Sequence, residues 1–344
     1  MGKFKEKMAA GEPYFIAEMS ANHGGSLNRA LEIVTAAAAS GADCLKVQTY
    51  TADTLTLDCD NEWFRIQGGL WDGRTLHDLY SEGSFPWEWH EAVRDRCIEL
   101  GMDFLSTPFD ETAVDFLCGL GVDALKIASF ELTDIPLIEY AASKGKAMIL
   151  STGMGTVDEI ADAVEACRAS GNNDTVLLRC CSEYPATFVD MDLASIPDMV
   201  ERFSCPVGFS DHSMGHTADV VAAALGARVI EKHFCLTRDD PTPDSAFSME
   251  PAEFKAMVDA VGDAVAAVGT SRYGAVGAQK DSTAFRRSVF ASADIATGEP
   301  FTKDNVRIVR PGYGLSPKHY RELLGKPAKR GYTFGEPIGE EELL

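Results

Sequence analysis

The stretch that decides the fold is YFIAEMSANHGGSLNRALEIVTAAAASGADCLKVQTY, residues 14–50. It begins with a short apolar run, which gives way to small and polar residues. A segment with helical spacing of its apolar residues follows and ends at Gly41, where a helix C-cap is expected. The next apolar run starts at Cys44. A strand, a helix and a second strand in this order predict a βαβ unit with parallel strands.

The same unit repeats as far as residue 268. Helix-like segments such as IPLIEYAASKG and VDEIADAVEACRASG separate the apolar runs, and many of them end in glycine. Strands are expected to begin at or near Tyr14, Cys44, Asp103, Ala124, Ala147, Val176, Val207 and Arg228. Eight strands alternating with helices over about 250 residues predict a (β/α)8 barrel of the TIM type. A doubly wound open sheet is the alternative, but no GxGxxG turn follows the first strand.

Polar residues gather where each predicted strand ends. They are Glu18, Lys46, Gln48, Thr107, Lys126, Ser129, Glu131, Ser151, Ser182, Ser210, Asp211, His212 and His233. Active sites of β/α barrels are built at the carboxyl ends of the strands. Burying ionisable groups without partners is costly, so a packed core has no use for so many of them. We therefore expect an active site at this end.

One connection is unusually long and lies between the second and third strands, in residues 51–102. It contains Trp63, Trp71, Trp87 and Trp89, which are all the tryptophans of the chain, and several glycines. An aromatic insertion at the catalytic end of a barrel suits a substrate lid. Packing of the individual tryptophans on the barrel rim is the alternative.

The composition changes after residue 268. Residues 269–283, GTSRYGAVGAQKDST, are rich in Gly, Ser and Ala and predict a linker. Residues 284–344 form a small unit in which short strands and turn signals dominate. A unit of about 60 residues is near the lower limit for independent folding, so we expect it to dock onto the barrel or onto a partner chain. The predicted domains are 1–268 and 284–344.

The charge and the cysteines limit the partners and the compartment. The net charge of −22 disfavours nucleic acid and anionic membranes as partners. No apolar run is long enough for a membrane span, and no apolar segment follows the lysines of MGKFKEKMAAGEPYF, so no secretory signal is expected. The nine cysteines lie mostly in apolar runs without CxxC spacing, which is typical of reduced thiols. We therefore expect a cytoplasmic protein, in which an anionic substrate needs a local cationic pocket.

His212 and His233 follow the ends of neighbouring predicted strands, so their imidazoles can converge. Two neutral imidazoles suit a divalent transition metal such as Mn, Fe, Co or Zn. Asp211 and Glu231 are available to orient these ligands or to hold water. The other five histidines lack such a pairing and are expected to be structural or peripheral.

Lys46 and Lys126 project from the same end of the barrel among hydroxyl groups. Two ammonium groups ringed by hydroxyls form a site for phosphate and carboxylate. The alternative is a Schiff-base aldolase, in which one lysine attacks a carbonyl. The histidine pair counts against it, because such aldolases need no metal.

Several segments together resemble the sialic acid synthase family. They are FIAEMSANHGGSLNRALEIVTAAAASGADCLKVQTY, FLSTPF, LKIASFE, ILSTGM, GFSDHSMGH, VIEKHF and TPDSAFSM, and the C-terminal unit with VRPGYGLSP resembles the antifreeze-like SAF domain of that family, which is β-clip-like. ANHGG, QGGLWDGRTLHDLY, CCSEYPA and TPDSAFSM are most similar to the pseudaminic acid synthases. The resemblance implies a β/α barrel, a divalent metal and a homodimer in which the SAF domain of one chain closes the site of the other.

The resemblance also assigns roles by motif. His212 and His233 take the metal-ligand places, with Mn²⁺ expected and Mg²⁺ or Co²⁺ as alternatives. The phosphoenolpyruvate places fall on Lys46, Thr107, Lys126, Ser129, Ser151 and Ser210. Places around the sugar and the reacting carbons fall on Glu18, Gln48, Glu131, Tyr184 and Asp244, and Arg310 would reach the site of the neighbouring chain. Ser182 departs from the asparagine of the neuraminate synthases, and residues 130–134, FELTD, also differ from them.

The expected reaction joins phosphoenolpyruvate to an amino-sugar aldehyde and releases phosphate by C–O cleavage. For a pseudaminic acid synthase the aldehyde is 2,4-diacetamido-2,4,6-trideoxy-L-altrose. N-acetylneuraminate or legionaminate synthesis by the same mechanism is the alternative, and a carbohydrate-binding protein without activity is a further one. Glu18 is the expected proton-transfer group, and a metal-bound water competes for that role.

Overall fold

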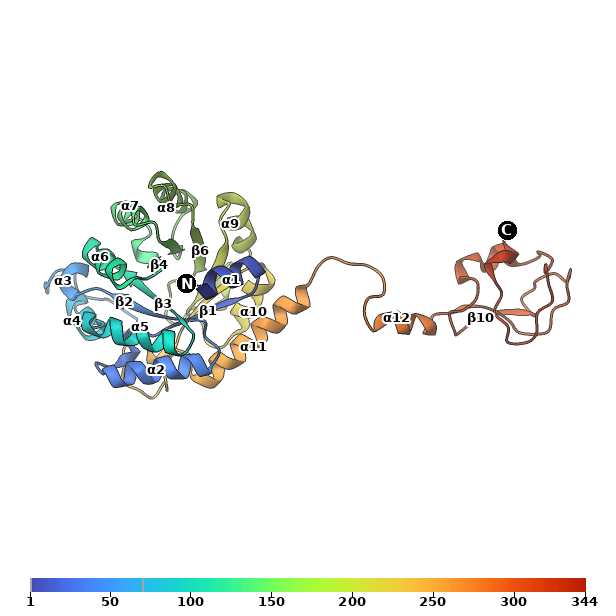
Figure 1. Ribbon diagram of the computed structural model, residues 1–344, viewed down its shortest axis with the longest axis horizontal. Helices are drawn as coiled ribbons and strands as arrows, with labels where there is room; N and C mark the ends of the chain where they lie inside the picture. The colour runs from blue at the N-terminus through green and yellow to red at the C-terminus, as the bar shows by residue number, and fades with distance from the viewer. Residues whose placement is uncertain (1, 70) are drawn as a thin grey trace. The chain divides into compact units, whose positions relative to one another are not determined.

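Eight parallel strands form one sheet in the computed structural model, which describes residues 2–69 and 71–344 (Figure 1). The strands are β1 Tyr14–Glu18, β2 Cys44–Thr49, β3 Asp103–Pro108, β4 Ala124–Ile127, β5 Ala147–Ser151, β6 Thr175–Cys180, β7 Val207–Asp211 and β8 Val229–His233. Their order is β3-β2-β1-β8-β7-β6-β5-β4. The two strands at the ends of this order, β3 and β4, also contact each other, so the sheet closes into a barrel. The prediction of a (β/α)8 barrel is confirmed.

Helices surround the barrel (Figure 1). They are α2 Leu27–Ala39, α5 His90–Glu99, α6 Glu111–Leu120, α7 Ile135–Ser143, α8 Val157–Ala169, α9 Ser195–Phe203, α10 Thr217–Ala224 and α11 Pro251–Val268. Ser26, Asp110 and Thr156 begin three of these helices by accepting hydrogen bonds from backbone N–H groups of the first turn. Gly121 ends α6 in the left-handed conformation that glycine adopts without strain.

A helix that we did not predict, α1 Gly2–Ala10, covers the amino end of the barrel. Its Phe4 packs edge to face on Tyr14 at a ring-centre distance of 5.1 Å. Both rings belong to an apolar cluster that fills the barrel interior, together with residues such as Ile16, Ile149 and Leu178. Packed side chains therefore fill the interior at this end, and only the opposite end can hold a substrate.

The insertion between β2 and β3 contains α3 Ala52–Leu55 and α4 Leu76–Gly83. A hairpin-like turn joins them, in which Ile66 N–H donates to Arg74 O and Leu76 N–H donates to Phe64 O, each at 2.9 Å. One residue of the motif QGGLWDGRTLHDLY, Leu70, lies outside the described residues. The arms of the turn are held by backbone hydrogen bonds, so the described residues of the insertion have a defined conformation.

The chain divides into two compact units at Gly269, and the second unit is Thr270–Leu344. The second unit contains β9 Ser288–Ala291 paired antiparallel with β10 Val306–Val309, and the short helices α12 Gln279–Ser282 and α13 Tyr320–Leu323. The linker expected at 269–283 therefore ends in a helical turn. The second unit has its own apolar core, which includes Val289, Phe301 and Ile338. In the part of the chain that the structure describes, no helix has both the length and the hydropathy to cross a membrane.

Candidate active site

Alternation along each strand decides which side chains enter the barrel. On β1, Tyr14, Ile16 and Glu18 share one face, so the apolar interior is followed by a carboxylate at the strand's end. Strand register places Glu18 beside Lys46 of β2 and beside His233 of β8. Three ionisable groups from three adjacent strands are thus brought to the carboxyl end of the barrel.

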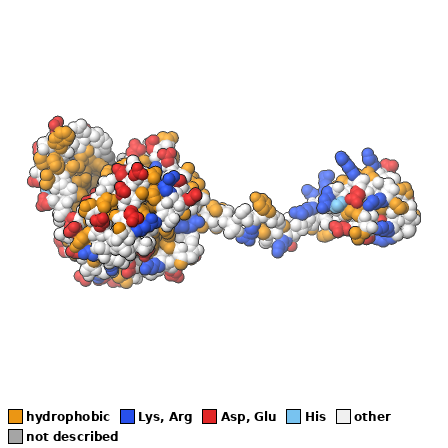
Figure 2. Space-filling view, turned by 90° about the horizontal axis from the view of Figure 1, so that it is seen from above, with side chains coloured by type: hydrophobic (Ala, Val, Ile, Leu, Met, Phe, Trp, Pro, Cys, Tyr) orange, Lys and Arg blue, Asp and Glu red, His pale blue; other side chains and the backbone are white. Residues whose placement is uncertain are grey.

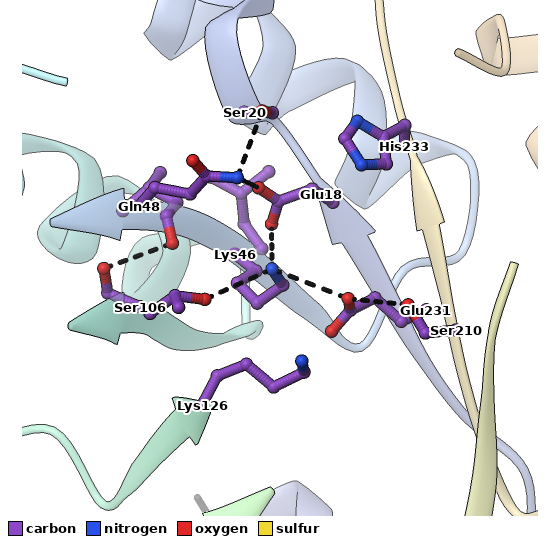
Figure 3. A network of polar contacts seen from close by, with 12 residues as sticks. Glu18, Ser20, Lys46, Gln48, Ser106, Lys126, Ser210, Glu231 and His233 are labelled. Carbon is purple, nitrogen blue, oxygen red and sulfur yellow. Dashed lines mark hydrogen bonds and ion pairs between the residues drawn. The ribbon is translucent and has the colours of Figure 1, made fainter. Parts of the chain in front are cut away.

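Lys46 lies at the centre of a buried polar network (Figure 3). Its Nζ is 2.7 Å from Glu18 Oε2 and 3.5 Å from Glu231 Oε1, and it donates a hydrogen bond to Thr107 Oγ1 at 3.4 Å. Gln48 Nε2 donates to the other oxygen of Glu18 at 3.2 Å. Burial opposes the charge, but Glu18 and Glu231 together raise the pKa of Lys46 above its usual value. Lys46 therefore remains a cation inside the barrel.

Lys126 is the second buried ammonium group of the site, and Figure 3 shows it beside the Lys46 network. Its Nζ donates to Ser151 Oγ at 2.6 Å and to Ile127 O at 3.0 Å. Burial lowers the pKa of Lys126. Neither of these hydrogen-bond partners carries a charge, so an arriving anion would find Lys126 ready to pair with it.

Three serines complete the hydroxyl ring. Ser129 and Ser182 both crowd the loop after β5 at Gly153, where a Cβ atom would collide with both of their side chains. Only glycine allows this close approach of backbone and hydroxyl groups. Ser210 Oγ donates to Glu231 Oε1 at 3.1 Å, so this serine orients a carboxylate of the Lys46 network.

His212 and His233 lie next to each other, with ring centres 5.3 Å apart. His212 Nδ1 is 2.9 Å from the carbonyl oxygen of Cys181, which fixes the proton on Nδ1 and leaves the lone pair on Nε2. His233 Nδ1 is buried and has no hydrogen-bond partner. Burial lowers the pKa of His233 well below its usual value, so this ring is neutral.

These features fit a divalent metal. A metal–imidazole bond of about 2.1 Å needs a ring nitrogen with a free lone pair. Burial keeps the His233 ring neutral. Nε2 of His212 is the nitrogen left free by the Cys181 carbonyl, although burial of this ring is outweighed by its contact with Cys180, which raises the pKa of His212. His233 Nδ1 is also a buried polar atom, and buried polar atoms are normally bound to a partner; none of the described residues forms a hydrogen bond with it. Within residues 2–69 and 71–344, no group of three or more His, Cys, Asp or Glu side chains is arranged to hold an ion. The two imidazoles are thus the protein ligands available to a metal here.

A cavity of ≈ 520 Å³ lies above these groups. Gln48, Glu131, Ser182, His233 and Asp244 form its polar side. Burial raises the pKa of Glu131 to about 7, and one of its oxygens is buried without a partner.

The ring of Tyr184 also lines the cavity and lies 4.3 Å from that of His212, centre to centre. Asp244 Oδ2 lies 3.9 Å from His233 Nδ1 and accepts a hydrogen bond from Ala21 N–H at 3.3 Å. Both residues therefore stand beside the histidine pair.

One expectation needs revision. Asp211 does not face His212 or His233; it pairs with Lys232, which also pairs with Asp219, outside the barrel strands. Asp211 lies between two inward-facing residues, so alternation along the strand turns it outward. Arg310 belongs to the second unit, and its reach into the site of a neighbouring chain stays a prediction.

Glu231 has a different place from the one that the strand pattern predicts. It is expected to orient the histidines or to hold water, whereas its Oε1 contacts Lys46 Nζ and accepts a hydrogen bond from Ser210 Oγ. The available signal was its spacing of two residues before His233, which places both side chains on one face of the strand.

The fold and the site together define a barrel enzyme with a C-terminal SAF domain. The NeuB family model matches residues 33–273 and the SAF domain model matches residues 286–344. The chain belongs to the NeuB family.

Relatives span nearly the whole chain. A protein of Campylobacter jejuni subsp. jejuni serotype O:23/36 named pseudaminic acid synthase is 44% identical over 329 residues, which are 96% of both chains. The N,N'-diacetyllegionaminic acid synthase of Legionella pneumophila subsp. pneumophila is 35% identical over 94% of this chain and 93% of its own. The N-acetylneuraminic acid synthetase of Leptospira borgpetersenii serovar Hardjo-bovis, a crystal structure with citrate, has a TM-score of 0.71 and 30% identity, covering 79% of this chain and 90% of its own.

Proposed function

We propose that this chain is a pseudaminic acid synthase, which condenses phosphoenolpyruvate with 2,4-diacetamido-2,4,6-trideoxy-L-altrose and releases phosphate. The observation that carries the proposal is the convergence of two buried ammonium groups, Lys46 and Lys126, and two adjacent imidazoles, His212 and His233, on one end of the barrel. The higher identity to the pseudaminic acid synthase, 44% against 35% for the legionaminic acid synthase, favours the altro sugar.

The ammonium groups and the hydroxyls would hold phosphoenolpyruvate. Lys126 with Ser151, and the serines at Gly153, offer hydrogen-bond donors for phosphate and carboxylate oxygens. Lys46 pairs with both Glu18 and Glu231 and keeps its positive charge. Lys126, whose hydrogen-bond partners are uncharged, would give an anionic substrate its local attraction inside a chain of net charge −22.

The metal we propose is Mn²⁺, with Mg²⁺ or Co²⁺ as alternatives, held by His212 Nε2 and His233. When bound, it would act as a Lewis acid on the aldehyde carbonyl. The chain's own residues would place that aldehyde: Tyr184 stacks beside the histidines, and Gln48, Glu131 and Asp244 line the polar side of the cavity.

The reaction forms one C–C bond and breaks one C–O bond. The electron pair of the C2=C3 bond of phosphoenolpyruvate forms the new bond to the aldehyde carbon, and the aldehyde oxygen takes up a proton. Water then adds to the cationic C2 and loses a proton, for which Glu18 is our candidate acceptor because Lys46 and Gln48 hold its two oxygens in place. The resulting intermediate expels phosphate from C2, which leaves the keto group of the product.

We further propose a homodimer in which Arg310 of one chain completes the site of the other. Charge supports it: residues 270–344 carry twelve Lys and Arg against nine Asp and Glu, a net charge of +3, whereas the rest of the chain has 19 against 44, a net charge of −25. Figure 2 shows the Lys and Arg side chains gathered on the second unit. Opposite charges steer two such surfaces together.

Exposed apolar side chains supply the second argument for this contact. Phe130, Met154 and Phe188 lie in loops that follow β4, β5 and β6, at the catalytic end, and are 63%, 55% and 58% exposed. On the second unit, Tyr313 and Phe334 are 71% and 74% exposed. Large apolar side chains exposed to solvent on both units indicate surfaces that could form a protein–protein contact.

Subunit mixing tests the dimer. His212→Ala and Arg310→Ala chains are each expected to be inactive, and after subunit exchange in equal amounts about a quarter of the sites would be intact if the SAF domain acts on the other chain. No recovery of activity after exchange would contradict the shared site. Mixing each variant with itself is the control.

Phosphate release with three sugars tests the function. We expect turnover with the diacetamido L-altrose sugar and much less with its manno counterpart and with N-acetylmannosamine. Equal rates with N-acetylmannosamine would favour a neuraminate synthase instead, and a covalent adduct trapped by borohydride would favour a Schiff-base aldolase.

We propose a cytoplasmic location because all nine cysteines of the chain are free thiols.

A further inference from the structure

The cavity above the site has an apolar wall that the proposed chemistry does not use. This wall comes from the insertion between β2 and β3 and consists of Leu55, Ile66, Trp71, Leu76, Leu79 and Tyr80. The polar lining residues, which include Gln48, Glu131, Ser182, His233 and Asp244, come from other parts of the barrel unit. A substrate in this cavity therefore contacts both the polar groups of the site and a hydrophobic surface.

Within this wall, Trp71 carries a buried hydrogen-bond donor that has no acceptor in the described part of the chain. Its Nε1 is buried and has no hydrogen-bond partner among the described residues. A buried N–H left without an acceptor is unfavourable, so the free site favours any ligand that offers an oxygen there. The hydrogen-bonded arms of the turn that presents Trp71 limit how far the indole can move to find water instead.

Ring distances place Trp71 relative to the histidines. Its ring centre is 6.1 Å from that of Tyr184, which is 4.3 Å from that of His212, so the indole lies within about 10 Å of the imidazole. An aldehyde carbon held at the histidines puts C4 of the sugar about 4 Å away, because C–C bonds are about 1.5 Å long. An acetamido group on C4 extends further from the sugar ring carbons than a hydroxyl on C4 does, so it comes closer to an indole within this distance.

We propose that Trp71 determines sugar specificity by donating a hydrogen bond from Nε1–H to the carbonyl oxygen of the acetamido group on C4. The aliphatic part of the wall, Leu55, Ile66 and Leu76, then packs against the acetamido methyl group and the methyl group at C6. A hydroxyl in place of either methyl group would be buried against apolar side chains without a partner, which is unfavourable. This inference rests on the proposed function and names the part of the sugar that the insertion recognises.

The test is Trp71→Phe, which removes the N–H donor and keeps an aromatic ring. The matched control is Trp63→Phe, because Trp63 lies in the same insertion but is 79% exposed and does not line the cavity. Each enzyme is assayed with the diacetamido sugar and with its analogue 2-acetamido-2,6-dideoxy-L-altrose, which has a hydroxyl on C4. The thermal midpoint of each variant checks that it is folded.

We expect Trp71→Phe to lower kcat/KM for the diacetamido sugar by about tenfold to a hundredfold, mainly through KM, and to leave kcat/KM for the C4-hydroxyl analogue nearly unchanged. Trp63→Phe should change neither. An equal loss with both sugars, or no loss with the diacetamido sugar, would overturn the role of the indole N–H. A Trp71→Phe chain that fails to fold is replaced by Trp71→His, which restores a ring N–H donor and should retain part of the discrimination.

Calorimetric binding separates this inference from the proposed function. If wild-type enzyme releases no phosphate with any of the sugars, the proposed function fails, and binding of the two sugars to wild type and Trp71→Phe still decides the inference. Tighter binding of the diacetamido sugar that disappears in Trp71→Phe supports the role of Trp71. Equal binding of both sugars to wild type refutes it.

Discussion

Glu131 is expected to make the stability of the barrel depend on pH. It ends a short helical turn, Ser129–Glu131, after β4, and its Oε2 is buried without a hydrogen-bond partner. Burial raises its pKa from 4.5 to about 7, although Lys126 acts in the opposite direction. The folded protein therefore holds a proton on Glu131 at pH values where the unfolded chain has already lost it.

The sign and size follow from proton linkage. Below about pH 4.5 both states are protonated and the group makes no difference; above about pH 7 both are ionised, and the folded state bears the cost of the buried charge. Stability thus falls as the pH rises between these values. At about 1.4 kcal/mol per pH unit the loss amounts to about 3 kcal/mol, an upper limit because Glu131 retains some solvent contact.

Glu131→Gln removes the titrating group with little change of shape. Relative to wild type, its free energy of unfolding should increase by up to about 3 kcal/mol between pH 4.5 and pH 8. Urea unfolding followed by tryptophan emission measures this, because all four tryptophans, at 63, 71, 87 and 89, lie in the barrel unit. Glu139→Gln, an exposed position on α7, is the control. A difference that stays constant over this pH range, or that falls with rising pH, would refute the reasoning.

Three further predictions concern charge, metal and packing. Lys46→Met leaves Glu18 buried without its cation and should cost about 3–5 kcal/mol in urea unfolding; a loss under about 1 kcal/mol would contradict a paired buried charge. Mn²⁺ should raise the thermal midpoint of wild type and a chelator should reverse this, whereas His212→Ala should show neither response while keeping its circular dichroism spectrum; a preserved response would exclude His212 as a ligand. Gly208→Ala drives a Cβ into a carbonyl oxygen of β8 and should cost about 3 kcal/mol, but Gly262→Ala, with open space in α11, should be neutral or stabilising.

The local pattern of apolar residues in the sequence was sufficient to predict the barrel. Predicted starts at Tyr14, Cys44 and Ala147 coincide with those of β1, β2 and β5, and the starts at Val176 and Arg228 differ by one residue from those of β6 and β8. Strand length and apolar content depend on neighbours in the chain, so they can be read without knowledge of the fold. The N-terminal helix α1 was missed because its single buried apolar residue, Phe4, gives no periodic signal.

The sequence predicted which residues lie at the site better than it predicted which of them contact each other. Lys46, Lys126, His212 and His233 were identified because strand ends in a barrel meet at one edge. Which carboxylate pairs with which cation depends on the register between strands, and this assigned Glu231 to the Lys46 network.

The sequence by itself determined the alternation of strands and helices, the end of the barrel that carries the site, and the residue types at that end. These features follow from periodicities of two and 3.6 residues, which act over a few positions of the chain. Only the tertiary structure paired Asp211 with Lys232, oriented the imidazole of His212 on Cys181 O and brought Trp71 from a distant insertion to within one aromatic ring of the histidines. The physical reason is that strand register and loop packing bring together groups far apart in the chain, and hydrogen bonding and burial then fix their protons and orientations.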